Sequence, residues 1–112
     1  MKDKRKSRRA PLDVYMNKYV SGVPYLSRTS DISPDGIRIE KLIEPSHAQK
    51  RVGLQFQLPG TDEVIYAEGE LLRGYEAATG RDASPDRVRF TLLTERHKKL
   101  IRSYVAEQGE TH

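Results

Sequence analysis

Three arginines near the start of the chain are the residues best suited to bind an anion. Arg5 and Arg9 lie four positions apart, and Arg8 immediately precedes Arg9. A guanidinium group keeps its positive charge at physiological pH and presents a planar fork of N–H donors that matches a phosphate. Taken alone, such a basic segment is more typical of a solvated tail that aids solubility, or contacts nucleic acid loosely, than of a specific site.

A second polar group occupies the segment DISPDG at residues 31–36, where a carboxylate, a hydroxyl and a glycine share one predicted turn. Pro34 suits the first central position of a tight turn, and Gly36 tolerates a positive φ at its exit. Because Asp, Ser, Pro and Gly are preferred in any tight turn, the spacing D-x-S-x-x-G is weak evidence of a binding site when it is taken alone.

The positive charge is concentrated at the N-terminus. The 112 residues include 20 Lys and Arg against 16 Asp and Glu, a formal net charge of +4. Residues 1–9 contain six basic residues and one acidic residue, so the rest of the chain has a net charge of −1. Basic domains that grip duplex DNA usually spread Lys and Arg over a folded face. We therefore expect no DNA partner, and we expect the arm at residues 1–9 to meet any anionic partner.

Composition narrows the class of protein further. The chain has no cysteine, which excludes disulfides, zinc–thiolate sites, iron–sulfur clusters and thiol nucleophiles. No apolar run approaches the roughly 20 residues of a membrane span, so we expect a cytoplasmic protein without membrane insertion. With 36% hydrophobic and 32% charged residues, a small core beneath a heavily charged surface is expected.

The candidate catalytic and metal-binding residues have ordinary structural explanations. His47, His97 and His112 share no metal-ligand spacing, so we expect solvated or structural roles and no metal site. Glu68 and Glu70 share one side of a predicted strand, where unpaired carboxylates on a solvated face are far more common than an acid–base pair. No activated-serine signature is present, and we expect that the protein is not an enzyme.

Period-two alternation of apolar and polar residues predicts about six short strands. They are expected at residues 10–20, 25–29, 37–42, 52–58, 63–76 and 88–92, with breaks at 21–24, 33–36, 59–62 and 78–86. Gly69 indicates a bulge or bend within its strand. In the last strand, Val88, Phe90 and Leu92 are expected to form one apolar row.

From Thr94 onward the period changes to that of an amphipathic helix, with Thr94 placed to cap its start and Gly109 to end it. The apolar stripe of this helix consists of Leu100, Ile101, Tyr104 and Val105. Short antiparallel strands with hairpin-length connections and one terminal helix favour a β-barrel or a two-sheet sandwich over a parallel α/β fold.

The order of these motifs resembles the signature of the PilZ family. R-x-x-x-R at residues 5–9 is followed, after a strand–loop–strand interval, by D-x-S-x-x-G at residues 31–36. The resemblance covers nearly the whole chain and extends to the hairpin segment FQLPG and to VRF in the last predicted strand. It implies an all-β fold with one C-terminal helix, in which a six-stranded antiparallel β-barrel is closed at one end by the helix.

The resemblance also divides the chain into parts. It implies a flexible basic arm at residues 1–9, a β-barrel at residues 10–93 and an amphipathic helix at residues 94–108, which together form one PilZ domain. The late strand departs from the family pattern, because Arg87 stands where the family often has glycine. Arg87 and Arg89 could add phosphate contacts, although a solvated strand face is the more typical explanation.

The ligand implied by the resemblance is cyclic di-GMP, which presents phosphates and guanine edges. The residues carried over from the family motif are Arg5, Arg9, Asp31, Ser33 and Gly36, with Lys4 and Arg8 as additional contacts. Arginine forks fit phosphate or guanine O6 and N7, while the Asp31 carboxylate can accept from guanine N–H groups or orient an arginine. Gly36 permits close backbone approach. Lys4, just before the arginine motif, favours a stacked pair of ligands over one.

The resemblance implies a receptor or adaptor that changes conformation when it binds cyclic di-GMP and signals to an effector protein that the sequence does not identify. One alternative is a PilZ-like protein-interaction module that does not use the nucleotide. Another is an OB-like barrel that binds single-stranded nucleic acid through the arm and through Tyr15, Tyr19 and Tyr25. The net charge of −1 outside the arm disfavours this last alternative.

Overall fold

Seven strands and one helix form the structure, a computed structural model that describes residues 8–42, 49–72 and 86–109. The elements are β1 (Ala10–Pro11), β2 (Tyr15–Val20), β3 (Val23–Ser33), β4 (Gly36–Lys41), β5 (Arg51–Gln57), β6 (Val64–Leu71), β7 (Asp86–Leu93) and α1 (Glu95–Gln108). The expected loop at residues 78–86 and the end of the strand predicted at 63–76 lie largely outside the described residues.

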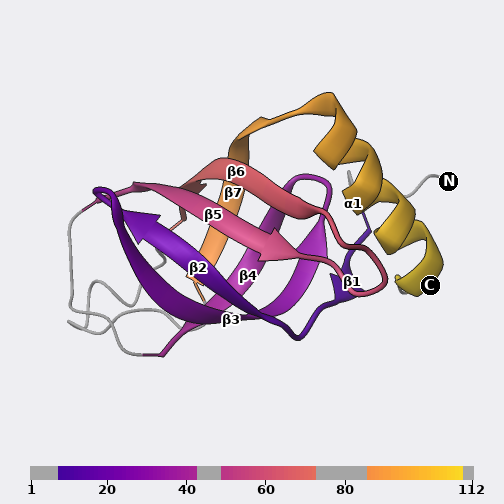
Figure 1. The fold of residues 1–112 in the computed structure, drawn as a ribbon, viewed down its shortest axis with the longest axis horizontal. Coiled ribbons are helices and arrows are strands. Elements are labelled where there is room, and N and C mark those ends of the chain that lie inside the picture. The colour runs from indigo at the N-terminus through magenta and orange to yellow at the C-terminus, as the bar shows by residue number, and fades with distance from the viewer. Residues whose placement is uncertain (1–7, 43–48, 73–85, 110–112) are drawn as a thin grey trace, which may run out of the picture.

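The sheet closes on itself. Its strands follow the order β3-β2-β5-β6-β7-β4, all neighbours are antiparallel, and β4 pairs again with β3 (Figure 1). The two-residue strand β1 pairs with the far end of β3, where Ala10 lies opposite Ile32, so β1 and β2 together act as one barrel strand. The predicted six-stranded antiparallel β-barrel with a C-terminal helix is therefore confirmed.

The strand expected at residues 10–20 is interrupted between β1 and β2. The Thr29 hydroxyl donates to the Leu12 carbonyl at 2.7 Å and accepts from the Val14 amide at 2.9 Å. The Thr29 side chain therefore adds hydrogen bonds at the break, beside the backbone bonds from the Leu12 amide to the Ser30 carbonyl and from the Thr29 amide to the Val14 carbonyl. The break predicted at residues 21–24 is shorter than expected, because Ser21 and Gly22 adopt positive φ values of 52° and 83° and make a two-residue turn.

Gly69 lies at a bulge, as predicted. The pairing of β6 with β7 shifts between Glu68 and Gly69, so that Gly69 faces Phe90 while Glu68 faces Leu92. Thr91 is the extra residue, and beyond it the alternation of β7 is reversed. The expected row of Val88, Phe90 and Leu92 is therefore wrong at its end, because Leu92 is 60% exposed.

Apolar side chains from every barrel strand fill the interior, with Met16, Leu54 and Ile65 among them. One charged side chain joins them, since Lys18 on β2 is fully buried and its Nζ lies 3.3 Å from a carboxylate oxygen of Asp86 on β7. Burial of an unpaired ammonium would be costly, so the ion pair is what allows a lysine inside the barrel.

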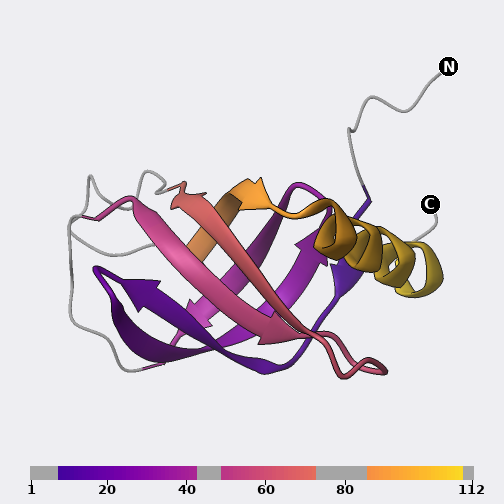
Figure 2. The same ribbon diagram turned by 45° about the horizontal axis from the view of Figure 1, so that its top comes forward.

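The helix α1 lies across the end of the barrel beside β1 (Figures 1 and 2). Ile101 and Val105 are buried against the barrel, and the Thr94 hydroxyl accepts from the His97 amide, so the predicted stripe and N-cap are confirmed. The Tyr104 hydroxyl donates to the Pro11 carbonyl at 2.8 Å and ties the helix to β1. Among the described residues no helix is long and apolar enough to cross a membrane.

A carboxylate on the β5–β6 hairpin clamps the first turn of α1. Arg96 donates to Glu63 through Nε at 2.6 Å and through Nη2 at 2.7 Å, and the His97 ring nitrogen Nε2 lies 3.2 Å from the same carboxylate. The hydrogen bonds from Arg96, with a smaller contribution from His97, lower the pKa of Glu63 below its ordinary value. The clamp therefore depends on an ionised Glu63.

The pH dependence of stability tests this clamp. Because the pKa of Glu63 is lower in the folded chain, its stabilisation is complete above the unfolded glutamate pKa of about 4.3 and is lost as the pH falls through the lower folded value. We expect the melting temperature of the wild type to fall more steeply below about pH 4.3 than that of Glu63→Gln. Glu107→Gln, on the exposed side of α1, is the control and should follow the wild type. Parallel curves for wild type and Glu63→Gln would contradict the clamp.

Candidate anion-binding site

Asp31, near the end of β3, holds two arginines. Its Oδ1 accepts from Arg9 Nε at 2.6 Å and lies 2.5 Å from Arg9 Nη2, and its Oδ2 lies 3.4 Å from Arg38 Nη1 on β4. Asp31 is 21% exposed, whereas both arginine side chains are 39% exposed. One half-buried carboxylate thus orients two guanidinium groups whose remaining N–H donors can face an anion.

Strand pairing explains why these side chains meet. Pro11 on β1 lies opposite Asp31, so Arg9, two residues earlier, leaves the barrel beside that carboxylate. The two-residue turn at Pro34 and Asp35 pairs Ser33 with Gly36 and thereby sets Asp31 opposite Arg38. The site therefore assembles from three strands that meet at one end of the barrel.

Ser33 fixes the turn beneath this site. Its side chain is fully buried, and its hydroxyl accepts from the backbone amides of Asp35 and Gly36, each at 3.2 Å. Arg9 Nη1 lies 3.4 Å from the same hydroxyl. The first role of Ser33 in this structure is therefore to hold the turn, and its contact with Arg9 links the turn to the arginine.

Gly36 is required for close backbone approach, as expected, and the positive φ that was also expected is wrong. Its φ is not positive, since the positive φ values among the described residues belong to Ser21, Gly22 and Gly60. A Cβ at Gly36 would instead stand 2.4 Å from the Val88 carbonyl oxygen on β7. The missing side chain allows β4 and β7 to approach closely, which closes the barrel beside the turn.

Of the residues predicted for the site, the structure brings Arg9, Asp31 and Ser33 into contact, and Gly36 ends the same turn. Arg8 is exposed next to Arg9. Lys4 and Arg5 lie outside the described residues, as does most of the predicted basic arm.

Arg38 is a site residue that the sequence analysis missed. The sequence contained the signal for it. When a two-residue turn follows Ser33, the register of the hairpin places Arg38 opposite Asp31. Of the two arginines in the last strand, Arg89 makes an ion pair with Glu70 across β6 and β7. That pairing occupies Arg89 with a neighbouring strand, in keeping with the ordinary structural explanation.

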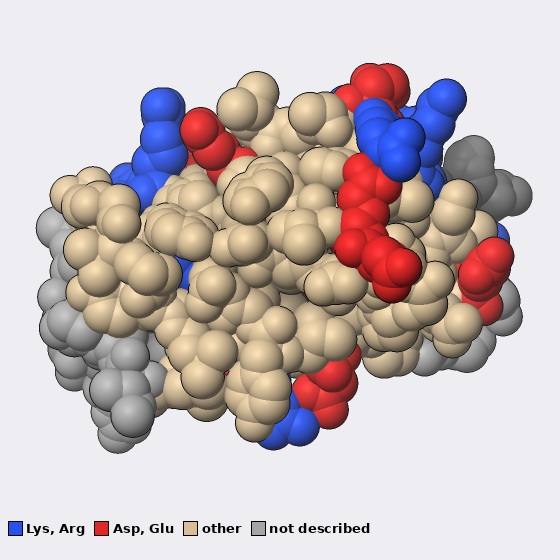
Figure 3. All heavy atoms as spheres, viewed as in Figure 1, with Lys and Arg blue, Asp and Glu red and all other residues tan. Residues whose placement is uncertain are grey.

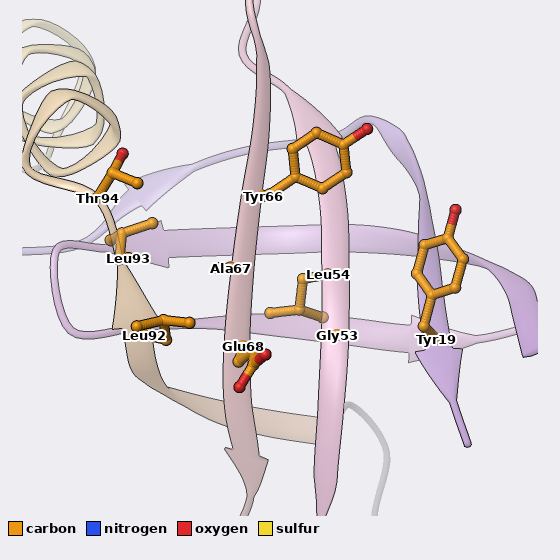
Figure 4. A pocket seen from close by; sticks show the side chains of 9 residues that line it. All are labelled: Tyr19, Gly53, Leu54, Tyr66, Ala67, Glu68, Leu92, Leu93 and Thr94. Atoms are coloured by element: carbon orange, nitrogen blue, oxygen red, sulfur yellow. The ribbon is translucent and has the colours of Figure 1, made fainter. Parts of the chain in front are cut away.

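A hollow of about 320 Å³ lies on another face of the barrel, over β2, β5, β6 and β7 (Figure 4). The rings of Tyr19 and Tyr66 flank Gly53, and Leu92 stands on the opposite side. No Lys or Arg lines the hollow, and charged side chains gather at the margins of this face rather than at its centre (Figure 3). It therefore lacks the cations that a phosphate needs, and it does not suit single-stranded nucleic acid.

The fold and the side chains around Asp31 together define a small β-barrel domain with a cluster of arginines at one end of the barrel. The model of the PilZ domain matches residues 3–107, so the chain belongs to the PilZ domain family. This finding confirms the family resemblance of the motifs. No curated protein matches the sequence.

Solved structures that share the fold include two that superpose over 95% of this chain. The inhibitor of motility MotI, also called DgrA, from Bacillus subtilis superposes with a TM-score of 0.72 at 14% identity, over 95% of this chain and 51% of that one. The PilZ domain of YcgR from Escherichia coli, solved with c-di-GMP, superposes with a TM-score of 0.63 at 13% identity, over 95% of this chain and 92% of that one. The chain thus spans about half the length of MotI.

The structural role of Gly36 can be measured without ligand. We expect Gly36→Ala to lower the free energy of unfolding by about 1–3 kcal/mol, because the new Cβ would overlap backbone of β7. Gly53→Ala is a matched control in a barrel strand, since its Cβ would meet Tyr19 at an ordinary 3.4 Å. Denaturant unfolding of both variants checks this, and equal stability of Gly36→Ala and wild type would contradict it.

Proposed function

We propose that the protein is a receptor that binds cyclic di-GMP at Arg9, Asp31 and Ser33 and signals to an effector protein. The observation that carries this proposal is the hydrogen bond of 2.6 Å between Arg9 and Asp31 at the site of the family motif. A guanidinium that is already oriented loses less side-chain entropy when a ligand binds. Membership of the PilZ family supports the choice of ligand.

Arg9 is the proposed principal contact. Asp31 occupies its Nε and one N–H of Nη2, and the Ser33 hydroxyl accepts from Nη1 at 3.4 Å. One N–H on each of Nη1 and Nη2 therefore stays available for a phosphate or for guanine O6 and N7. Because the Asp31 carboxylate already accepts from Arg9 and Arg38, we assign it the role of orienting arginines rather than that of reading guanine N–H groups directly.

The arm before Arg9 supplies the rest of the proposed site. Arg5, Arg8 and Lys4 would close over the ligand from the side opposite the turn, as the spacing of the motif implies. Ordering the arm would offset part of the interaction free energy. Residues 31–36 would then be the fixed half of the site and the arm its adaptable half.

A route for signalling begins where the arm joins the barrel. A Cβ on Gly109 would stand 3.3 Å from the Arg9 carbonyl oxygen, so the end of α1 lies against the backbone of the arm. Tyr104 also bonds the carbonyl of Pro11. Ligand capture that moves residues before Ala10 would therefore change the surface around the end of α1, where an effector could distinguish the two states.

The comparisons favour this regulatory role without identifying the effector. The YcgR domain was solved with c-di-GMP, and MotI is an inhibitor of motility. By analogy, we propose a cytoplasmic protein that regulates a partner and is not an enzyme. Its ligand would be cyclic di-GMP, and its partner a protein rather than DNA or a membrane.

Calorimetric titration with cyclic di-GMP tests the ligand. We expect Arg9→Ala to bind about 10–100-fold more weakly than the wild type, the equivalent of roughly 1.5–3 kcal/mol for a charge-assisted hydrogen bond. Asp31→Ala should also bind more weakly, because Arg9 and Arg38 lose the carboxylate that orients them.

The matched control is Arg28→Ala. It removes an arginine paired just as closely with a carboxylate, Asp13 at 2.6 Å, but away from the turn. We expect it to bind like the wild type. Absence of cyclic di-GMP binding in the wild type, or wild-type affinity in both site variants, would refute the proposal.

The location of binding is tested separately by amide-shift titration. Shifts should concentrate at residues 4–10 and 31–36, where the ligand would lie, and cyclic di-GMP should outcompete GMP and GTP. Equal responses to all three nucleotides would instead favour a nonspecific anion surface. An unchanged spectrum would favour the alternative of an interaction module that does not use the nucleotide.

A further inference from the structure

Arg38 and Arg87 face each other on the outside of the barrel. Arg38 on β4 lies opposite Asp31 on one side and opposite Arg87 of β7 on the other. Residues directly opposite in antiparallel strands project to the same face, with Cβ atoms about 4.5–5.5 Å apart. The chain neighbours Ile37 and Val88 are buried, so the two arginines project outward.

Asp31, Arg38 and Arg87 form a row across β3, β4 and β7, and Arg9 is bonded to its Asp31 end. Positive and negative charges are not balanced along this row. Arg9 and Arg38 share the single carboxylate of Asp31, and within the described parts of the chain no carboxylate forms an ion pair with Arg87. Three other arginines each pair with a carboxylate that no second arginine shares. The pairs of this kind are Arg28 with Asp13, Arg89 with Glu70 and Arg96 with Glu63. The row at Asp31 therefore holds three guanidinium groups against one carboxylate.

Like charges directly opposite each other in a sheet are destabilising, so this arrangement lowers the stability of the barrel without a bound anion. A phosphate between Arg38 and Arg87 would reverse that effect, because a phosphate accepts charge-assisted hydrogen bonds from both guanidinium forks. The position is continuous with the Arg9 site, since Asp31 belongs to both.

We infer that Arg38 and Arg87 form a phosphate-binding subsite that extends the ligand site from the turn onto the outer face of β4 and β7. The inference rests on the proposed function, and its ligand is a phosphate of bound cyclic di-GMP. Neither arginine belongs to the R-x-x-x-R or D-x-S-x-x-G motif. This chain therefore holds its ligand with cations from the barrel as well as from the arm.

Arg87→Gln is the decisive variant, because the hydrogen bonds of Asp31 and Ser33 in the described residues do not involve Arg87. We expect its affinity for cyclic di-GMP to fall about tenfold in calorimetry at low salt. Without ligand it should melt at the same temperature as the wild type or slightly higher, since a like-charge contact has been removed. The difference in affinity should narrow at high salt, where charges are screened.

Arg102→Gln is the matched control, because it removes the same charge from an exposed position on α1. It should bind within twofold of the wild type. If Arg102→Gln weakens binding as much as Arg87→Gln does, net charge explains the loss and the subsite is wrong. The subsite is also wrong if the wild type binds and Arg87→Gln binds equally well, an outcome that leaves the proposed function intact. A wild type that does not bind cyclic di-GMP overturns both.

Discussion

Close backbone approach at the turn between β3 and β4 is the constraint on which the site depends. Gly36 has no Cβ, and the Val88 carbonyl oxygen lies within 2.4 Å of where one would stand. β4 can therefore pair with β3 on one side and with β7 on the other, which closes the barrel. The same closure sets Asp31, Arg38 and Arg87 in one row, so the positions of the charged groups follow from the closure.

The local charge at this row differs from the net charge of the barrel. Outside residues 1–9 the chain has a net charge of −1, which led us to expect that the arm alone would meet an anion. Several carboxylates, however, are already paired with arginines elsewhere on the surface, such as Glu63 with Arg96 and Glu70 with Arg89. Because paired groups largely cancel each other's field, the barrel can be acidic in total and cationic beside Asp31.

The helix and the site share one attachment to the barrel. Tyr104 bonds the carbonyl of Pro11, and Gly109 packs against the backbone of Arg9, so α1 contacts the chain on both sides of Ala10. At its other end, the first turn of α1 is held by Glu63. One end of the helix is thus fixed to the β5–β6 hairpin, while the other end adjoins the ligand site that we propose.

Most strands, the turns and the terminal helix could be predicted from the sequence, because alternation, turn residues and helical stripes depend on near neighbours in the chain. The family could be predicted as well, through motifs of fixed spacing. The closed barrel is needed to show that a hydroxyl from Thr29 bridges the break in the first strand, that Lys18 is buried against Asp86, and that Arg38 lies opposite Arg87. These features require contacts between separate strands, and no local pattern of residues encodes which strands the closed barrel will bring together.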